Sequence, residues 1–346
     1  MLVMLVQENI PLSAYSTMRL GGRARYLTEI HNRGEIAEAL AWAEERKLPI
    51  VMIGGGSNIF WSDAGYPGLV VVNQISGFEI FKEDDANAYV SVGAGENWDS
   101  VVARVVEAGY SGVEELSLIP GTTGATPIQN VGAYGREIAD VLTTVEAYDR
   151  HEGKLVTLRA SDCNFSYRNS RFKAQDKGRF FISSITFQVT TATPKPPFYN
   201  SLENYFKQHA IGTYSPKVVR DAVIAIRSSK LPDPAKVANN GSFFYNPIIP
   251  EEDLHLLIDD YPNLRYWHTN DGKVKLSAAW LVEQAGFKDF HDKATGFGTW
   301  PTQSLVIVNE NSTKTADLLA FKQRVVEAVK SKFSVTLVQE PELIEP

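Results

Sequence analysis

The chain has 346 residues and a formal net charge of −7, with 44% hydrophobic and 22% charged residues. This length favours two or three domains, and the composition is typical of a folded globular protein, which excludes an intrinsically disordered one. The acidic balance, without a basic stripe between aromatic residues, argues against nucleic acid as a partner.

Three further features of the sequence limit the kinds of site and the cellular location that we expect. Cys163 is the only cysteine of the sequence, which excludes an internal disulfide and a multi-cysteine metal site. The histidines show no ligand spacing, so we expect no metal. The opening run MLVMLVQEN lacks the basic flank of a signal peptide, and no apolar stretch of about 18 residues could span a membrane. We therefore predict a cytoplasmic protein without a membrane partner.

The first region, residues 1–77, combines helix and strand. Residues 35–49 have apolar side chains at helical spacing, and residues 49–58 are typical of a buried strand that ends in a glycine turn. A second strand is expected at residues 69–73, LVVVN. The helix residues expected on one buried face are Ile36, Ala39, Leu40 and Ala43.

The second region, residues 78–215, is richer in strands. A strand at 88–95 precedes a helix from about Asn97 to Ala108, and a glycine-rich stretch then continues to Gly135. Three more strands are expected at residues 141–150, 154–160 and 179–190. We interpret the first two regions as two lobes.

The third region, residues 216–333, begins with a helix. Ser215 suits the N-cap and Pro216 the first helical position. Further on, we expect a helix around 275–287, a strand at 304–309 and a final helix from about Thr315 to Phe333.

Two glycine loops follow predicted strands. The sequence GGGSN, residues 54–58, could offer backbone amides to a phosphate, or it could be a plain tight turn. A dinucleotide fingerprint fails there because Ile59 occupies the third glycine position, and in GAGENW it fails at Trp98. No Walker A lysine is present either.

A longer glycine-rich segment, PGTTGATPIQNVGAYG at residues 120–135, is nearly free of charge and rich in hydroxyl and amide groups. Such a segment favours a large ligand with neutral edges, such as a flavin or a nucleotide, over an irregular connection.

Ordered motifs run along almost the whole chain: STMRLGG, GGGSN, VGAGENW, IPGTTGATPIQNVGAYG, FSYRNSRFK, KLPDP, NNGSFFYNP, KLSAAWLV and QEPEL. In this order and spacing the sequence resembles the UDP-N-acetylenolpyruvoylglucosamine reductases, the MurB family of flavoenzymes. The resemblance implies an α+β protein with a vanillyl-alcohol-oxidase-type FAD-binding fold in lobes 1–77 and 78–215. It further implies an α+β substrate-binding lobe at 216–333 and a tail, 334–346, that returns to the site.

The resemblance also implies ligands and the residues that contact them. We expect noncovalent FAD, NADPH as hydride donor, a UDP-sugar substrate and a monomer. The residues assigned to the cofactor are Gly54, Gly55, Gly56, Ser57, Asn58, Pro120, Gly121, Thr122, Gly124, Ala125, Gln129, Asn130, Gly132, Ala133, Tyr134, Gly135 and Arg227.

Three catalytic residues follow from the same motifs. The implied reaction adds hydride to a vinyl carbon and leaves negative charge beside a carboxylate, which Arg168 and a protonated Glu342 would stabilise. Ser242 would then donate the proton, while Phe243 and Phe244 shield the site. Taken without the resemblance, Ser242 is a turn hydroxyl, Arg168 a surface or ion-pair arginine, and Glu342 a solvated tail residue.

The expected substrate contacts are Tyr167, Lys230, Asn246 and Tyr199. Tyr199 ends the proline-rich stretch 190–199, which is either a linker or a loop that closes over the site. Tyr245 stands where some relatives have lysine.

Two other functions fit parts of this pattern. An FAD-dependent oxidase of an alcohol or sugar would use the same cofactor fold, and a nucleotide-sugar binder without catalysis would use the same ligand loops. The motifs of the third region favour the reductase.

Overall fold

The computed structural model describes residues 4–269 and 271–346, so the first three residues of the opening apolar run lie outside the described residues. The chain forms two compact units. Unit 1 runs up to Ile10 and includes Ala24–Gly55 and Pro67–Ser228, whereas unit 2 consists of Pro11–Arg23, Gly56–Tyr66 and Ser229–Pro346. Over the described ranges, no helix has the length and apolar character needed to cross a membrane.

The first sheet of unit 1 has the strand order β1 (Gln7–Pro11), β2 (Arg23–Ile30), β5 (Tyr66–Asn73) and β3 (Ile50–Ile53). Helix α1 (Gly34–Glu45) buries Ile36, Ala39 and Ala43 against this sheet, as its periodicity predicts. Strand β3 pairs in parallel with β5 and is the last strand in this order, so the glycine loop that follows β3 lies at one edge of the sheet.

The second sheet of unit 1 is antiparallel, with the order β11 (Lys154–Arg159), β10 (Leu142–Asp149), β12 (Phe180–Thr190), β7 (Asn87–Gly93) and β6 (Phe78–Lys82). Helix α2 (Trp98–Glu107) begins where Asn97 accepts a hydrogen bond from the Ser100 amide, so the predicted start is confirmed. Its apolar face joins strands β7 and β12 in one core.

The glycine-rich segment of unit 1 contains a small hairpin between β8 (Gly132–Ala133) and β9 (Arg136–Glu137). Its two-residue turn is Tyr134-Gly135, and both have positive φ, 50° and 82°. A turn of this kind matches the twist of paired strands and normally selects glycine or asparagine. Short 3₁₀ turns flank the hairpin: η2 (Glu114–Leu116), η3 (Thr123–Ala125) and η4 (Ile138–Asp140).

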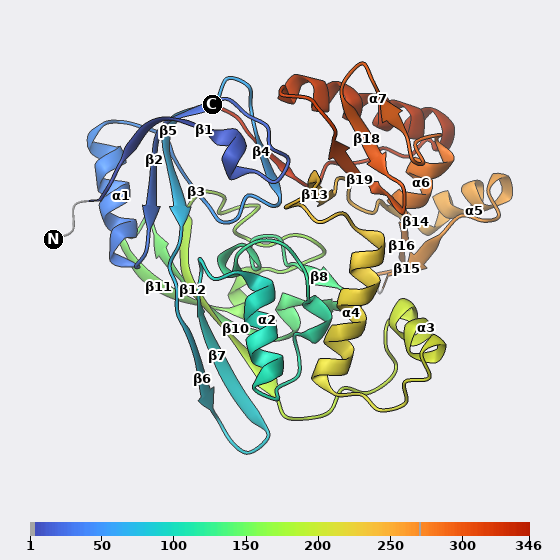
Figure 1. Cartoon of the computed structure of the whole chain (residues 1–346), viewed down its shortest axis with the longest axis horizontal. Coiled ribbons are helices and arrows are strands. Elements are labelled where there is room, and N and C mark those ends of the chain that lie inside the picture. Colours follow the sequence, from blue (N-terminus) through green and yellow to red (C-terminus); the bar gives the residue numbers. More distant parts are fainter. Residues whose placement is uncertain (1–3, 270) are drawn as a thin grey trace. The chain divides into compact units, whose positions relative to one another are not determined.

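Two helices complete unit 1. Helix α3 (Asn200–Gln208) and helix α4 (Pro216–Lys230), whose last two residues belong to unit 2, lie next to one another (Figure 1) and share a small apolar cluster. The Val218 amide donates to the Ser215 hydroxyl at 3.2 Å, which confirms the predicted N-cap. The ring of Phe198 packs against Phe206 and Tyr214, so the proline-rich stretch is packed on these helices near its end.

Unit 2 is built on an antiparallel sheet with the order β13 (Ala238–Ser242), β19 (Gln303–Asn309), β18 (Phe297–Trp300) and β17 (His291–Asp292). Helices α6 (Ala278–Gln284) and α7 (Thr315–Phe333) pack on this sheet (Figure 1) and bury aromatic side chains in its core. The final helix has the predicted bounds.

Smaller elements of unit 2 surround this sheet. A second sheet has the order β14 (Ile248–Pro250), β16 (Lys273–Leu276) and β15 (Tyr266–His268), with helix α5 (Glu251–Asp260) beside it. The 3₁₀ turn η1 (Leu12–Tyr15) leads into the STMRLGG motif. Strand β20 (Glu342–Ile344) pairs in parallel with β4 (Ile59–Trp61), so the end of the chain lies beside the residues that follow GGGSN. Together the two units confirm the predicted α+β class.

Candidate functional site

In unit 1, the glycine turn after β3 lies against the long glycine-rich segment. A Cβ atom on Gly54 would lie 2.1 Å from the Thr122 hydroxyl oxygen, and one on Gly55 would lie 3.4 Å from the Gly121 Cα. A side chain at Gly54 would therefore clash with the Thr122 side chain, whereas a Cβ atom at Gly55 would make ordinary van der Waals contact. The Thr122 hydroxyl oxygen is buried and has no hydrogen-bond partner within the described part of the chain. Such an orphaned group requires a ligand or a water.

A second orphaned group comes from helix α4. The Arg227 Nε is buried and has no hydrogen-bond partner among the residues that the structure describes. Burial lowers the pKa of its guanidinium, while the fields of Tyr134 and Asp99 oppose that shift. Asp99 itself is held by Arg220, through two bonds of 2.6 and 3.1 Å. A buried guanidinium N–H that is left unpaired is costly, and an anionic or carbonyl-bearing ligand would pair it.

Tyr134, at the tip of the β8–β9 hairpin, connects this arginine to the predicted closing loop. Burial raises the pKa of the Tyr134 hydroxyl, and Arg227 lowers it by a smaller amount. The Tyr199 ring meets the Tyr134 ring edge-on, with centroids 6.0 Å apart. Tyr199 is 45% exposed, which leaves much of its ring accessible to a ligand.

Arg168 lies against the same hairpin. Its Nη2 donates to the Gly132 carbonyl at 2.5 Å, and its Nη1 donates to the Asn130 carbonyl at 3.3 Å. The backbone of Arg168 has φ of 52°, an uncommon value for a residue with a side chain. Its side chain is 20% exposed. The loop geometry thus directs a largely enclosed guanidinium onto the glycine-rich segment.

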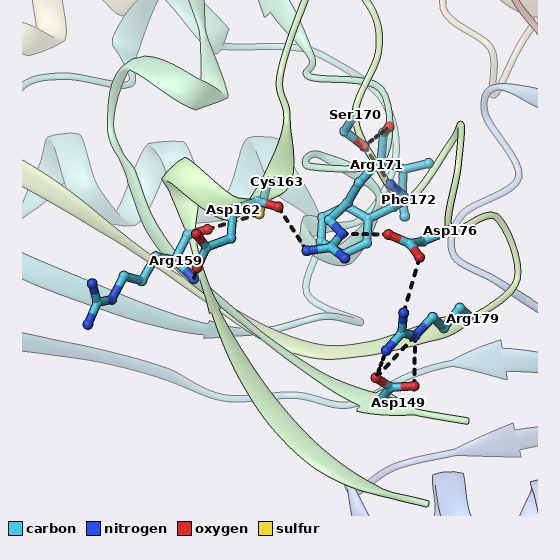
Figure 2. A network of polar contacts seen from close by, with 10 residues as sticks. Asp149, Arg159, Asp162, Cys163, Ser170, Arg171, Phe172, Asp176 and Arg179 are labelled. Carbon is cyan, nitrogen blue, oxygen red and sulfur yellow. Dashed lines mark hydrogen bonds and ion pairs between the residues drawn. The ribbon is translucent and has the colours of Figure 1, made fainter. Parts of the chain in front are cut away.

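Polar contacts fasten the loop that carries Tyr167 and Arg168 (Figure 2). Arg179 binds Asp149 through contacts of 2.6 to 3.1 Å and reaches Asp176 at 3.3 Å. Asp176 in turn accepts from Arg171 at 2.7 Å, and Arg171 donates to the Asp162 carbonyl in the turn η5 (Ala160–Cys163). These contacts join the loop to Asp149 at the end of strand β10 and to the turn η5. The pKa of Asp149 falls to about 2, chiefly through its hydrogen bonds with Arg179.

The same loop is fixed to the glycine-rich segment as well. The Ser170 hydroxyl donates to the Ile128 carbonyl at 2.6 Å. The Tyr167 ring is half-buried and lies 5.3 Å from the Arg168 guanidinium carbon. A cation near an aromatic face is stabilised by the ring quadrupole.

Other residues assigned to the cofactor lie in the same segment. Gly124 packs so tightly that a Cβ atom there would lie 2.6 Å from the Cβ of Ala94. Gly124 and Ala125 belong to the turn η3, and the remaining members, Pro120, Gln129 and Ala133, are half-buried or exposed along it. Their contacts with a ligand remain predictions.

In unit 2, the second half of GGGSN begins with a closely packed glycine in the left-handed conformation. Gly56 has φ of 66°, and a Cβ atom there would lie 2.3 Å from the Tyr15 carbonyl oxygen. The carbonyl of Gly56 accepts from the Thr17 amide at 3.1 Å. The next residue, Ser57, offers its carbonyl to the Asn240 side chain at 3.1 Å. Ser57 therefore lies beside Asn240 of the NNGSFFYNP motif, 183 residues further along the chain.

Ser242 is the last residue of β13, where it pairs with Val306 across a break in the strand register. It is half-buried, and it directly precedes two buried phenylalanines, Phe243 and Phe244, in the core of unit 2. Ser242 is thus a strand residue and not a turn residue. Its contact with a substrate remains a prediction.

Glu342 is the first residue of β20. Its amide donates to the Asn58 carbonyl at 2.9 Å, and its side chain is half-buried. Two residues earlier, the Glu340 amide donates to the carbonyl of Phe243, the residue after Ser242. The tail therefore brings Glu342 near both GGGSN and NNGSFFYNP within unit 2.

Two of the predicted substrate residues, Asn246 and Lys230, lie in unit 2. The Asn246 side-chain oxygen accepts from the Ala278 amide at 3.0 Å, which places this side chain at the start of helix α6. Lys230 ends helix α4 and is exposed, and its carbonyl accepts from the Thr302 hydroxyl at 2.8 Å.

Two residues that contact predicted site residues were not predicted, Asn240 in unit 2 and Glu137 in unit 1. Asn240 is 5% exposed and donates to the Thr17 hydroxyl and to the carbonyls of Ser57 and Ile59. Glu137 accepts from the Asn130 side chain at 2.7 Å and lies 3.7 Å from Arg168. Asn240 lies inside a quoted motif, two positions before Ser242. The contacts of Glu137 depend on tertiary structure, which no local pattern reveals.

Comparison with known families agrees with this geometry. A family model described as an FAD binding domain matches residues 24–159, and one described as the C-terminal domain of UDP-N-acetylenolpyruvoylglucosamine reductase matches residues 233–344. The glycine contacts and the Thr122 hydroxyl lie within the first match, whereas Arg227 lies outside both matches.

Full-length relatives extend the likeness. A UDP-N-acetylenolpyruvoylglucosamine reductase from Ralstonia nicotianae is 38% identical over 98% of this chain and 99% of its own. One from Pseudomonas syringae pv. syringae is 39% identical over 98% of both. The crystal structure of such a reductase from Thermus caldophilus covers 98% of this chain and 99% of its own, with a TM-score of 0.68 at 21% identity. The predicted α+β fold, an FAD-binding fold with the C-terminal domain of this reductase family, is confirmed.

Proposed function

The chain belongs to the UDP-N-acetylenolpyruvoylglucosamine reductase family, and we propose that it reduces the enolpyruvyl group of UDP-N-acetylglucosamine enolpyruvate to give UDP-N-acetylmuramate. NADPH is the hydride donor. The observation that carries this function is the end-to-end likeness, because both the cofactor region and the C-terminal domain match. A shared cofactor fold alone would support many reactions.

The residues of unit 1 fit FAD. Gly54 packs against Thr122 with no room for a side chain. Buried atoms of Thr122 and Arg227, which have no partner among the described residues, can pair with a polar ligand. Backbone amides suit the diphosphate of a dinucleotide, and an unpaired guanidinium suits its anionic or carbonyl groups. We assign these residues to noncovalent FAD. When bound, FAD carries a hydride from NADPH to the substrate.

Arg168 and Glu342 act on the substrate carboxylate. Addition of hydride to the terminal vinyl carbon of the substrate leaves an enolate-like charge that extends onto that carboxylate. Arg168 stays charged and is held in a fixed orientation by two carbonyls, so it can stabilise this charge without reorganising. Glu342 assists in its neutral form, because a second negative charge would repel the developing one.

Ser242 supplies the proton that completes the reaction. The enolate carbon next to the carboxylate is strongly basic, and a serine hydroxyl within hydrogen-bond reach can protonate it when donors meet the resulting charge. Lys230 is such a donor. The core position of Phe243 and Phe244 holds the strand end that presents Ser242.

The substrate contacts and the biological setting complete the proposal. Tyr167, Tyr199 and Asn246 bind the UDP-sugar, and Tyr199 belongs to a loop that closes over it. The enzyme works as a cytoplasmic monomer in the synthesis of peptidoglycan precursors.

Absorbance spectroscopy tests the function directly. We expect the purified protein to be yellow, to lose its flavin absorbance when NADPH is added without oxygen, and to regain it when UDP-N-acetylglucosamine enolpyruvate follows. The product should be UDP-N-acetylmuramate in an amount equal to the NADPH consumed. UDP-N-acetylglucosamine, which lacks the vinyl group, is the matched control and should restore nothing.

Each alternative function gives a different result. An oxidase would be reduced by an alcohol or sugar and would reoxidise rapidly in air. A nucleotide-sugar binder without catalysis would be colourless and would not oxidise NADPH. Either result would overturn the proposal.

A further inference from the structure

Glu137 lies between Arg168 and the buried core of the glycine-rich segment. One of its carboxylate oxygens, Oε1, is 3.7 Å from Arg168 Nη1, and the other, Oε2, accepts from the Asn130 side chain at 2.7 Å. The carboxylate therefore bridges a guanidinium and an amide. Its side chain is 35% exposed.

Asn130 is fixed on every side. It is 1% exposed, and its amide nitrogen donates to Glu137 and also to the Ser166 carbonyl at 3.1 Å. Its amide oxygen accepts from the Ala139 amide at 3.2 Å, and its own carbonyl accepts from Arg168. Because Ser166 precedes the Tyr167-Arg168 pair, Asn130 holds the loop and the hairpin together.

The backbone beneath Arg168 is shaped for this contact. In the β8–β9 hairpin, Gly132 is the register partner of Glu137, and a Cβ atom on Gly132 would lie 2.9 Å from both Arg168 Nη1 and Glu137 Cγ. Arg168 and Asn130 both have positive φ, 52° and 48°. Residues with side chains keep such conformations where the surrounding contacts enforce them, and these often lie at functional sites.

We propose that Glu137 is a positioning residue, which together with Asn130 fixes the guanidinium of Arg168 in the orientation that the reaction needs. This inference rests on the function proposed above, because Glu137 would act only through Arg168. Glu137 itself makes no contact with the substrate. A guanidinium on a long side chain has many rotamers, and a misplacement of about 1 Å can reduce the rate of a reaction about a hundredfold.

The test separates the two half-reactions in rapid-mixing experiments. We expect Glu137→Ala to leave flavin reduction by NADPH unchanged and to slow reoxidation by the enolpyruvyl substrate about ten- to a hundredfold. Flavin content and melting temperature should stay close to those of the wild type. Glu137→Gln keeps an oxygen for the Asn130 hydrogen bond, so it should recover reoxidation to within about fivefold of the wild type.

A double-mutant cycle shows whether Glu137 acts through Arg168. If it does, adding Glu137→Ala to Arg168→Ala should slow reoxidation no further, because the two residues act as a unit. Glu146→Ala is the matched control, since Glu146 also pairs with an arginine, Arg33 at 3.1 Å, on the same unit. This control should retain both half-reactions.

The outcomes distinguish this inference from the function beneath it. If Arg168→Ala slows reoxidation but Glu137→Ala does not, or if their effects multiply, Glu137 has no positioning role. If Arg168→Ala reoxidises like the wild type, the role of Arg168 itself is wrong. Should Glu137→Ala fail to fold, Glu137→Asp takes its place, because the shorter side chain withdraws the carboxylate from Arg168 and Asn130. Slower reoxidation with unchanged flavin reduction then supports the inference, and reoxidation at the wild-type rate overturns it.

Discussion

The Glu342 amide donates a hydrogen bond to the Asn58 carbonyl at 2.9 Å, although 283 residues lie between the two in the sequence. This contact starts the parallel pairing of β20 with β4, so the last strand fixes the Glu342 backbone independently of its side chain. The carboxyl group can therefore be altered without releasing the tail.

Glu342→Gln tests this carboxyl group. We expect reduction by NADPH to persist and reoxidation by the enolpyruvyl substrate to fall about a hundredfold, because the variant loses an acid that meets the developing charge. Glu345→Gln, three positions along the same tail and exposed, should behave like the wild type. Full activity of Glu342→Gln would remove this residue from the mechanism.

Ser242→Ala should produce the same split between the two half-reactions. The hydroxyl is the proposed proton donor, so its removal should slow formation of UDP-N-acetylmuramate by about 10² to 10⁴ while flavin reduction persists. The strand should remain intact, since the Ser242 backbone pairs with Val306. Rapid quenching with product analysis measures the effect, and equal loss of both half-reactions would contradict the assignment.

Gly54→Ala probes the proposed cofactor contact. Its added Cβ would lie 2.1 Å from the Thr122 hydroxyl, so that hydroxyl must turn away from the position assigned to the FAD contact. We expect the purified variant to contain less than about half of the wild-type flavin. Gly212→Ala is the control, because a Cβ there meets nothing within 4 Å. Equal flavin in both variants would remove Gly54 from the cofactor site.

Periodic and capped elements could be predicted from the sequence. The helix Thr315–Phe333 and the caps Asn97 and Ser215 depend on local spacing and side-chain chemistry, which the sequence displays directly. The fold class and the family rest on ordered motifs. The division into three lobes and the roles of the site residues stay predictions.

Other features could not be predicted because distant contacts produce them. Tyr134 takes a turn position that normally selects glycine or asparagine, and the buried Asn240 joins motifs that are far apart in the chain. Arg168 adopts positive φ because the loop is held at Asn130 and Gly132. Local preference opposes each of these conformations or is silent about it.

The contacts in Figure 2 predict a structural role for Arg179. Arg179→Ala leaves the buried Asp149 without its main partner, so we expect a lower melting temperature together with faster proteolysis of the 164–178 loop. Arg179 depresses the pKa of Asp149 to about 2, so the stability that this pair adds is present above the ordinary pKa of 3.8 and is lost as pH falls through about 2. Melting curves between neutral and acidic pH measure this. Arg150→Ala, which removes an exposed neighbour, is the control.

Two adjacent buried glutamates give the protein an opposite dependence on pH. Glu114 and Glu115 are 2% and 7% exposed, and Glu115 Oε1 lies 3.9 Å from the Arg136 Nε. Burial, assisted by the charge of Glu114, raises the pKa of Glu115 from 4.5 to about 7. The folded state therefore binds more protons than the unfolded state in this window, so Glu115 makes the protein less stable as pH rises from 4.5 to about 7.

Glu115→Gln removes this titration while preserving the shape of the side chain. We expect the free energy of unfolding of the variant, measured by urea denaturation, to exceed that of the wild type by on the order of 2–3 kcal/mol at about pH 8. At about pH 4 the two proteins should differ little. Glu107→Gln, at the exposed end of α2, should shift neither value. A gain in stability that is equal at both pH values would show that the substitution acts through packing. Because Glu115 is not among the residues assigned to the cofactor, the flavin content of the variant should equal that of the wild type.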